Sequence, residues 1–142
     1  MKTIWLLVVS FGMLILTSSC KEKECGCTEG DLIGKWSVDE FMSLESVAYP
    51  KNDDFNPVIE FRSDGSYQIQ LDANSCNGSF VLNGKDEIEI SSAGCTKICC
   101  DSPFSEKFIR MLPQVESYSF EDEVLNLYVS GWGWIHLKPV SN

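Results

Sequence analysis

The sequence has few basic side chains, and this shortage excludes two broad classes of partner. Its 142 residues include 11 lysines and arginines against 21 aspartates and glutamates, a formal net charge of -10 at pH 7. Nucleic acids and anionic lipid headgroups are both held by clusters of basic side chains. The sequence therefore argues against a nucleic-acid-binding protein and against adhesion of the domain surface to anionic lipid.

Histidine is scarce as well, which limits the catalysis that the chain could perform. Only His136 is present, so a histidine-centred triad would have to be built around it. It lies on an expected strand beside Trp134 and Ile135, where a hydrogen-bonded structural histidine is commoner than a general base. Because no acid, base and nucleophile converge in the pattern, we expect a protein that is not an enzyme and uses no cofactor.

Redox and metal motifs are missing too. The cysteine spacings are Cys25-Gly26-Cys27, Cys95 to Cys99, and the adjacent Cys99-Cys100, so no Cys-X-X-Cys pair exists. This argues against thiol exchange and against a four-cysteine zinc site. Asp53 and Asp54 do not have the spacing of a known calcium loop. We therefore expect no metal site.

Long apolar runs are absent except at the N-terminus. The run from Ile4 to Leu16, about thirteen residues, follows Lys2 and precedes small polar residues, the layout of a secretory signal. It is too short to span a bilayer, which takes about twenty residues. Small residues directly before Cys20 resemble a lipobox, where the signal peptidase for lipoproteins cuts and the new N-terminal cysteine is acylated, for example with palmitate.

These features predict a signal peptide of lipoprotein type over residues 1–19, with lipid attachment at Cys20. Residues 20–31 would form a charged tether, since Lys21-Glu22-Lys23-Glu24 resists burial. The protein would then be anchored in the bacterial cell envelope, at the outer membrane, and be either periplasmic or surface-exposed. The alternative is a soluble secreted domain in which Cys20 is merely the first cysteine.

Cysteine itself is abundant, and seven in so short a chain indicate an oxidising compartment. Setting Cys20 aside, fifteen connectivities are possible and spacing cannot select one. The neighbours Cys99 and Cys100 would need a strained ring to bond each other, so we expect each to pair elsewhere. The disulfide candidates are Cys25, Cys27, Cys76, Cys95, Cys99 and Cys100.

The remaining sequence predicts a mostly β domain. Apolar and polar residues alternate between dipeptides that tolerate positive φ, namely Asp64-Gly65, Asn77-Gly78 and Asn83-Gly84. We expect about seven or eight short strands, which most often close into a small antiparallel barrel. The segments concerned are those around Trp36 and Val38, Val58 to Phe61, Tyr67 to Leu71, Ser79 to Leu82, Ile88 and Ile90, Leu125 to Val129, and Trp132 to Leu137.

One segment has helical rather than strand periodicity. Ser102 and Pro103 are typical of an N-cap followed by proline in the first turn. Phe104, Phe108, Met111 and Leu112 then follow at helical spacing, and Pro113 ends the pattern. The sequence predicts a short helix over about residues 102–112, covering one end of the barrel.

From Leu32 to Leu137 the order of features resembles the META domain, or HslJ-like, family. The matching pieces are Ile33-Gly34-Lys35-Trp36, Ile59-Glu60-Phe61 with Asp64-Gly65, Ser75-Cys76-Asn77-Gly78-Ser79-Phe80, Thr96-Lys97-Ile98-Cys99-Cys100, Glu106-Lys107-Phe108, and Val124-Leu125-Asn126-Leu127-Tyr128. The resemblance implies a barrel-like domain over residues 32–140, exported in several members, and no catalytic residues. It also places Cys76 and Cys100 at motif positions, where a bond between them would enclose about 24 residues.

The possible binding surface is an aromatic strip on the last strand. Trp132, Trp134 and His136 would share one face, opposite Gly133, Ile135 and Leu137, and exposed aromatic residues mark binding surfaces. The alternative is core packing of the tryptophans. We expect a non-enzymatic, lipid-anchored module that binds a protein or glycan partner or protects against stress. A lipocalin-like carrier of a small apolar ligand is the alternative function.

Overall fold

A computed structural model describes residues 29–45, 49–51 and 54–141 of the chain. The predicted signal peptide, Cys20, Cys25, Cys27 and Asp53 therefore lie outside the described residues. Within these ranges no helix has both the length and the apolar composition needed to cross a membrane.

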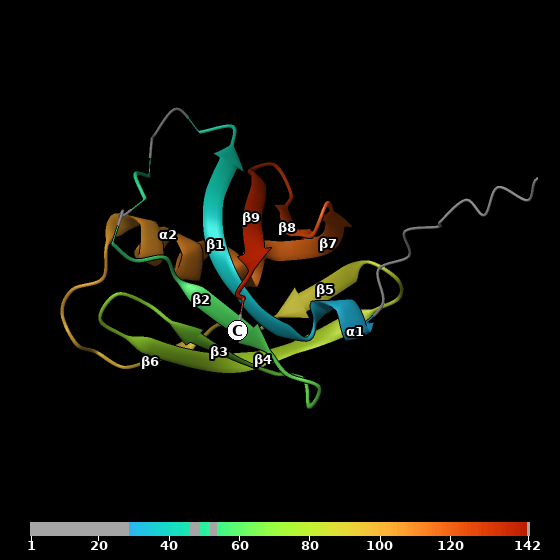
Figure 1. Cartoon of the computed structure of the whole chain (residues 1–142), viewed down its shortest axis with the longest axis horizontal. Coiled ribbons are helices and arrows are strands. Elements are labelled where there is room, and N and C mark those ends of the chain that lie inside the picture. Colours follow the sequence, from blue (N-terminus) through green and yellow to red (C-terminus); the bar gives the residue numbers. More distant parts are fainter. Residues whose placement is uncertain (1–28, 46–48, 52–53, 142) are drawn as a thin grey trace, which may run out of the picture.

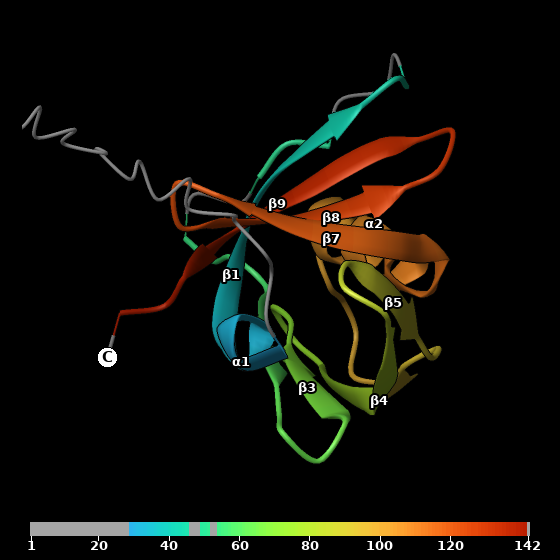
Figure 2. The same ribbon diagram turned by 90° about the vertical axis from the view of Figure 1, so that its right-hand side faces the viewer.

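The chain forms a closed antiparallel barrel, which confirms the predicted fold class (Figures 1 and 2). The strands pair in the order β3-β2-β1-β9-β8-β7-β5-β4, and β4 pairs back with β3 to complete the ring. The short β6 pairs with β4 beyond the end of β5. The strands are β1 (Gly34–Ser43), β2 (Val58–Phe61), β3 (Ser66–Gln70), β4 (Ser75–Asn83), β5 (Glu87–Ile90), β6 (Gly94–Cys95), β7 (Val115–Glu121), β8 (Val124–Val129) and β9 (Gly133–Pro139).

The ring is unevenly closed. Most neighbouring strands pair over four or more residues, whereas β5 and β7 share the single pair Glu87 and Ser117. One further backbone bond, from the amide of Tyr118 to the carbonyl of Asp86 at 2.9 Å, supports this seam.

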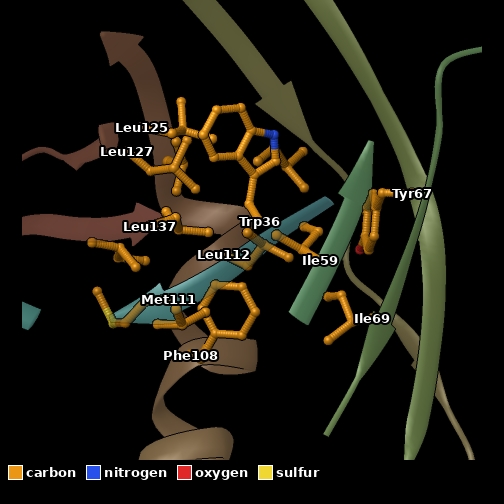
Figure 3. Close-up of a cluster of buried hydrophobic side chains, with 14 of the residues drawn as sticks. Trp36, Ile59, Tyr67, Ile69, Phe108, Met111, Leu112, Leu125, Leu127 and Leu137 are labelled. Atoms are coloured by element: carbon orange, nitrogen blue, oxygen red, sulfur yellow. The ribbon is translucent and has the colours of Figure 1, made fainter. Parts of the chain in front are cut away.

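Alternation along the strands fills the barrel interior with side chains. Inward-facing positions on every major strand are buried and form one hydrophobic cluster (Figure 3). Trp36 packs against Phe120 with ring centroids 5.6 Å apart, and its indole N–H donates to the carbonyl of Leu32 in α1 (Glu29–Leu32). Burial of this apolar surface is the main source of the domain's stability.

The predicted helix is present as α2 (Pro103–Met111), followed by a 3-10 turn, η1 (Leu112–Gln114). Ser102 is the N-cap and accepts a hydrogen bond from the amide of Ser105. Phe104 stacks on Phe41 near the end of β1, at 4.4 Å between ring centroids. The helix therefore closes the end of the barrel where β1 finishes.

Two local predictions are wrong, for different physical reasons. Asn77-Gly78 is not a turn but lies inside β4, where Gly78 makes room for the ring of Tyr67. The strand β7 was not expected, because a bulge between Val115 and Ser117 interrupts its alternation. The other two turns are present, and Gly65 and Gly84 have φ of 77° and 79°.

Candidate functional site

The predicted aromatic strip is only partly formed. Trp134 and His136 point outward from β9, but Trp132 lies in the turn before the strand and is 7% exposed. Gly131 and Gly133 have φ of 69° and 143°, so the backbone around Trp132 is not extended. The expectation that Trp132 shares a face with the other two is therefore wrong.

The exposed apolar surface lies instead across three neighbouring strands, and we call it the apolar patch: Met42, Leu44, Tyr128 and Trp134. Met42 and Trp134 are cross-strand partners, and the ring of Trp134 lies 4.6 Å from that of Tyr128. Met42 is 56%, Leu44 85% and Trp134 37% exposed. Together with Ser43 and residues 131–133 they line an open groove of about 420 Å³.

Two features of the backbone determine where the apolar patch lies. The register of β1 against β9 shifts between Val38 and Glu40, so Glu40 and Met42 turn outward. Further along, Gly133 lies so close to β1 that an added Cβ would be 2.9 Å from the Cα of Ser43. Only glycine allows this approach, which brings Met42 and Trp134 side by side.

An ion pair beneath the patch has a buried cation and an exposed carboxylate. Lys107 of α2 is 6% exposed, and its Nζ lies 2.9 Å from the Glu45 carboxylate. The same ammonium lies 4.7 Å from the ring centroid of Tyr49 and 5.0 Å from that of Trp132. These aromatic faces stabilise the cation.

Lys107 and Glu45 each stabilise the charged form of the other. The pKa of Glu45 is lowered, chiefly by the hydrogen bond from Lys107 and further by the hydrogen bond from the hydroxyl of Tyr49. Burial alone would lower the pKa of Lys107, but its contacts with Glu45 and Tyr49 outweigh burial and raise it. The pair joins the segment after β1 to the helix that closes the barrel.

The polar groups beside the patch are paired with one another. His136 lies across from Glu40, with Nδ1 3.4 Å from the carboxylate. Asp39 contacts both Lys138 and Lys51 at 2.7 Å, and these two lysines, Lys138 first, lower its pKa. Among the described residues no hydroxyl or thiol hydrogen-bonds His136, and no group of metal-ligating side chains forms.

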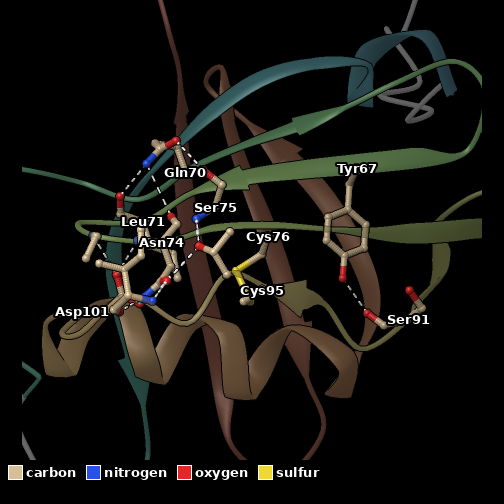
Figure 4. The surroundings of a disulfide bond; sticks show 12 residues. Tyr67, Gln70, Leu71, Asn74, Ser75, Cys76, Ser91, Cys95 and Asp101 are labelled. Carbon is tan, nitrogen blue, oxygen red and sulfur yellow. Dashed lines mark hydrogen bonds between the residues drawn. A yellow bond between two sulfur atoms is a disulfide. The ribbon is translucent and has the colours of Figure 1, made fainter.

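The cysteine pairing differs from the expectation. Cys76 bonds to Cys95 on the neighbouring β6, with Cα atoms 4.0 Å apart, and not to Cys100 (Figure 4). Cys99 and Cys100 bond to each other, with Cα atoms 3.1 Å apart, so the expectation that each pairs elsewhere is also wrong. Both bonds lie on or near β6, on a part of the barrel distinct from the apolar patch.

Hydrogen bonds made by the buried Asn74 hold the cysteine-bearing loop against the barrel. Asn74 is buried and donates to Asp101 Oδ2 at 2.6 Å and to the carbonyl of Ile98 at 2.7 Å. Its Oδ1 accepts from the hydroxyl of Thr96 and the amide of Ile98 (Figure 4). This arrangement is structural.

Sequence reasoning found Trp134 and His136 but missed the rest of the site. Tyr128 could have been placed, because it alternates with the inward-facing Leu127 and Val129. Met42 could not, because the bulge before it reverses the alternation of β1. No local signal marked Lys107 as buried, since lysine at a helical surface position is ordinarily solvated.

Comparison with known proteins identifies relatives of the domain. The model of the META domain matches residues 31–136. The crystal structure of a DUF4847 family protein from Bacteroides vulgatus ATCC 8482 superposes with a TM-score of 0.59 at 20% identity, covering 78% of this chain and 95% of that chain. The NMR structure of a protein from Burkholderia xenovorans gives 0.63 at 14% identity, with coverage of 78% and 85%. These structures share the fold alone. No curated protein matches the chain.

Proposed function

We propose, from the premise that this chain belongs to the META domain family, that it is a binding protein of the cell envelope rather than an enzyme. The match over residues 31–136 confirms the resemblance seen in the sequence. A META barrel is consistent with a non-enzymatic protein. In this proposal the lipid on Cys20 provides the anchor and the apolar patch provides the binding surface.

The observation that carries the proposal is the apolar patch itself. Met42, Leu44 and Trp134 are large apolar side chains gathered on one wall of an acidic protein, around a groove of about 420 Å³. Exposed apolar side chains that cluster, with an aromatic residue among them, are typical of a protein-binding surface. Isolated exposed apolar residues would need no such explanation.

The position of the patch suits an anchored protein. The tether would enter the domain next to α1, beside the first residue of β1. The patch lies around the other end of that strand, which spans ten residues, or about 33 Å. A partner would therefore meet the surface on the part of the domain farthest along β1 from the anchor.

The alternative of a lipocalin-like carrier has less support. A barrel of eight strands can either fill its interior with side chains or hold one small ligand. Here inward-facing residues from all the major strands, together with α2, form one packed cluster (Figure 3). The groove beside Trp134 lies on the outer wall.

The experiment tests the anchor and the patch separately. Cells expressing the full chain are labelled with an alkyne analogue of palmitate, and Cys20→Ala should lose both the label and the membrane fraction. Protein captured from solubilised envelope is then compared between Trp134→Ala and Ile98→Ala, which truncates an exposed apolar side chain elsewhere. Equal capture by these two variants would refute the patch as the binding surface, and retained label in Cys20→Ala would refute the anchor.

A further inference from the structure

The apolar patch is one end of a longer row that crosses six strands. Register pairs connect Met42 to Trp134, Trp134 to Tyr128, Tyr128 to Ser117, Ser117 to Glu87, and Glu87 to Asn83. Directly paired residues have side chains on the same face of a sheet. The outer wall thus carries one continuous row from β1 to β4.

The two ends of this row differ in chemistry. A second hollow, of about 400 Å³, adjoins the first at Tyr128 and is lined by Glu87, Glu89 and Glu116. All three glutamates are exposed, and in the described part of the chain none of them forms an ion pair. We call them the acidic end. The lysines nearest the apolar patch, in contrast, are paired with Asp39 or Glu45.

We infer that this row binds an extended segment of a protein partner, with an apolar side chain in the groove beside Trp134 and basic side chains against Glu87, Glu89 and Glu116. The inference rests on the proposed function and names the chemistry of its partner. The groove supplies the buried anchor that dominates most interfaces. The acidic end supplies charge complementarity, which orients the partner and excludes acidic segments.

The dimensions fix the length of the segment. The groove beside Trp134 on β9 and Glu87 on β5 are separated by three strand spacings of about 4.8 Å, or about 14 Å across the outer wall. An extended chain advances about 3.4 Å per residue, so about four residues separate an apolar side chain in the groove from a basic side chain at the acidic end. A heptapeptide with the apolar anchor near one end and the basic residues near the other provides this separation.

The same features disfavour the other occupants. A second copy of this chain carries a net charge of -10 and would place acidic side chains against acidic side chains. A neutral glycan offers no cation to the acidic end. A basic segment with one apolar end satisfies both halves of the row.

The test uses synthetic heptapeptides and the cell-processed chain purified from membranes. The first probe is Leu-Phe-Ser-Thr-Ser-Lys-Lys, with free ends blocked. The second replaces both lysines with glutamate, the third replaces Leu-Phe with Ser-Ser, and the fourth moves the lysines next to Leu-Phe. We expect the first to bind with Kd between about 10 μM and 1 mM and the others at least about tenfold more weakly.

Matched variants assign the two ends. Trp134→Ala should weaken binding of the first probe at least about tenfold, whereas Ile98→Ala should not change it. Glu87→Gln with Glu116→Gln should weaken binding severalfold and reduce its salt dependence. The control Glu121→Gln with Glu123→Gln removes the same charge from the β7–β8 hairpin and should leave both unchanged. Thermal unfolding of each variant confirms that it is folded.

The outcomes separate this inference from the proposed function. If the glutamate probe binds as well as the lysine probe, or if the two charge-neutralised variants behave alike, the inference of a basic partner segment is wrong, although the apolar patch still binds peptide. No binding of the first probe at about 1 mM would also overturn the inference. If envelope capture is unchanged in Trp134→Ala, the proposed function fails as well. Self-association abolished by Trp134→Ala would identify a second copy as the occupant.

Discussion

Replacing Gly78 with alanine should destabilise the barrel strongly, although the change adds one methyl group. Gly78 faces Tyr67 across the β3–β4 pair. A Cβ at this position would lie 2.5 Å from Cζ and 2.7 Å from Cε1 of the tyrosine ring. Tyr67 is buried, and its hydroxyl donates to the carbonyl of Ser91 at 2.7 Å (Figure 4). The ring cannot move aside without loss of this bond.

Two costs determine the size of the effect. Forcing one extra carbon into a packed core costs about 1–3 kcal/mol. Loss of the hydrogen bond between Tyr67 and Ser91 adds about 1 kcal/mol. We therefore expect Gly78→Ala to lower the free energy of unfolding by about 2–4 kcal/mol, out of a total of about 5–15 kcal/mol for a domain of this size.

Gly94→Ala is the matched control, because Gly94 pairs with Asn77, the neighbour of Gly78. A Cβ on Gly94 would come no closer than 4.0 Å to its nearest neighbour, so this variant should be near neutral. Unfolding in urea, followed by tryptophan fluorescence without reductant, measures both. Tyr67→Leu should lower the free energy of unfolding by less in the Gly78→Ala background than in the wild-type background. Equal stability of the two alanine variants would refute the reasoning.

Three further predictions concern charge, pH and the disulfide. Because Lys107 is a buried cation, Glu45→Gln should destabilise the fold more than Lys107→Met in urea unfolding; the reverse order would show that the buried cation does not depend on Glu45. Burial alone would raise the pKa of Asp72, but the hydrogen bonds that its carboxylate accepts outweigh burial and lower it. The Asp72 carboxylate therefore adds to the free energy of unfolding at neutral pH, and this contribution is lost as the pH falls below about 4. Wild type and Asp72→Asn should converge in stability at that low pH. Replacing Cys76 and Cys95 by serine opens a loop with a sequence separation of 19 and should cost about 3 kcal/mol in calorimetry; an unchanged melting temperature would contradict it.

The fold was largely predictable because alternation and capping are local signals. The strands around Ile69 and Leu127 and the helix capped by Ser102 follow directly from residue spacing. Failures occurred where one residue interrupts the period. The bulge in β7 concealed a strand, and Gly78 resembled a turn although it accommodates an aromatic ring.

The candidate site was predictable only in its last strand. Trp134 and His136 follow from the alternation of β9, whereas Met42 depends on a bulge and Glu87 on pairing between distant strands. Disulfide partners were equally inaccessible, since Cys95 faces Cys76 only because β6 extends the pairing of β4. These relations are created by the closure of the barrel, and no local pattern encodes them.

The single pair between β5 and β7 also determines how the barrel would respond to a bound segment. Glu87 and Ser117 form that pair and are also neighbouring members of the six-strand row, between Tyr128 and Asn83. A peptide bound across the row would contact both β5 and β7, the neighbouring strands of the ring that share the fewest residue pairs. Occupancy would then slow local opening, and amide hydrogens of β5 and β7 would exchange more slowly while those of β1 and β2 stayed unchanged. Binding of the peptide to the outer surface would in this way reduce local opening of the barrel wall between β5 and β7.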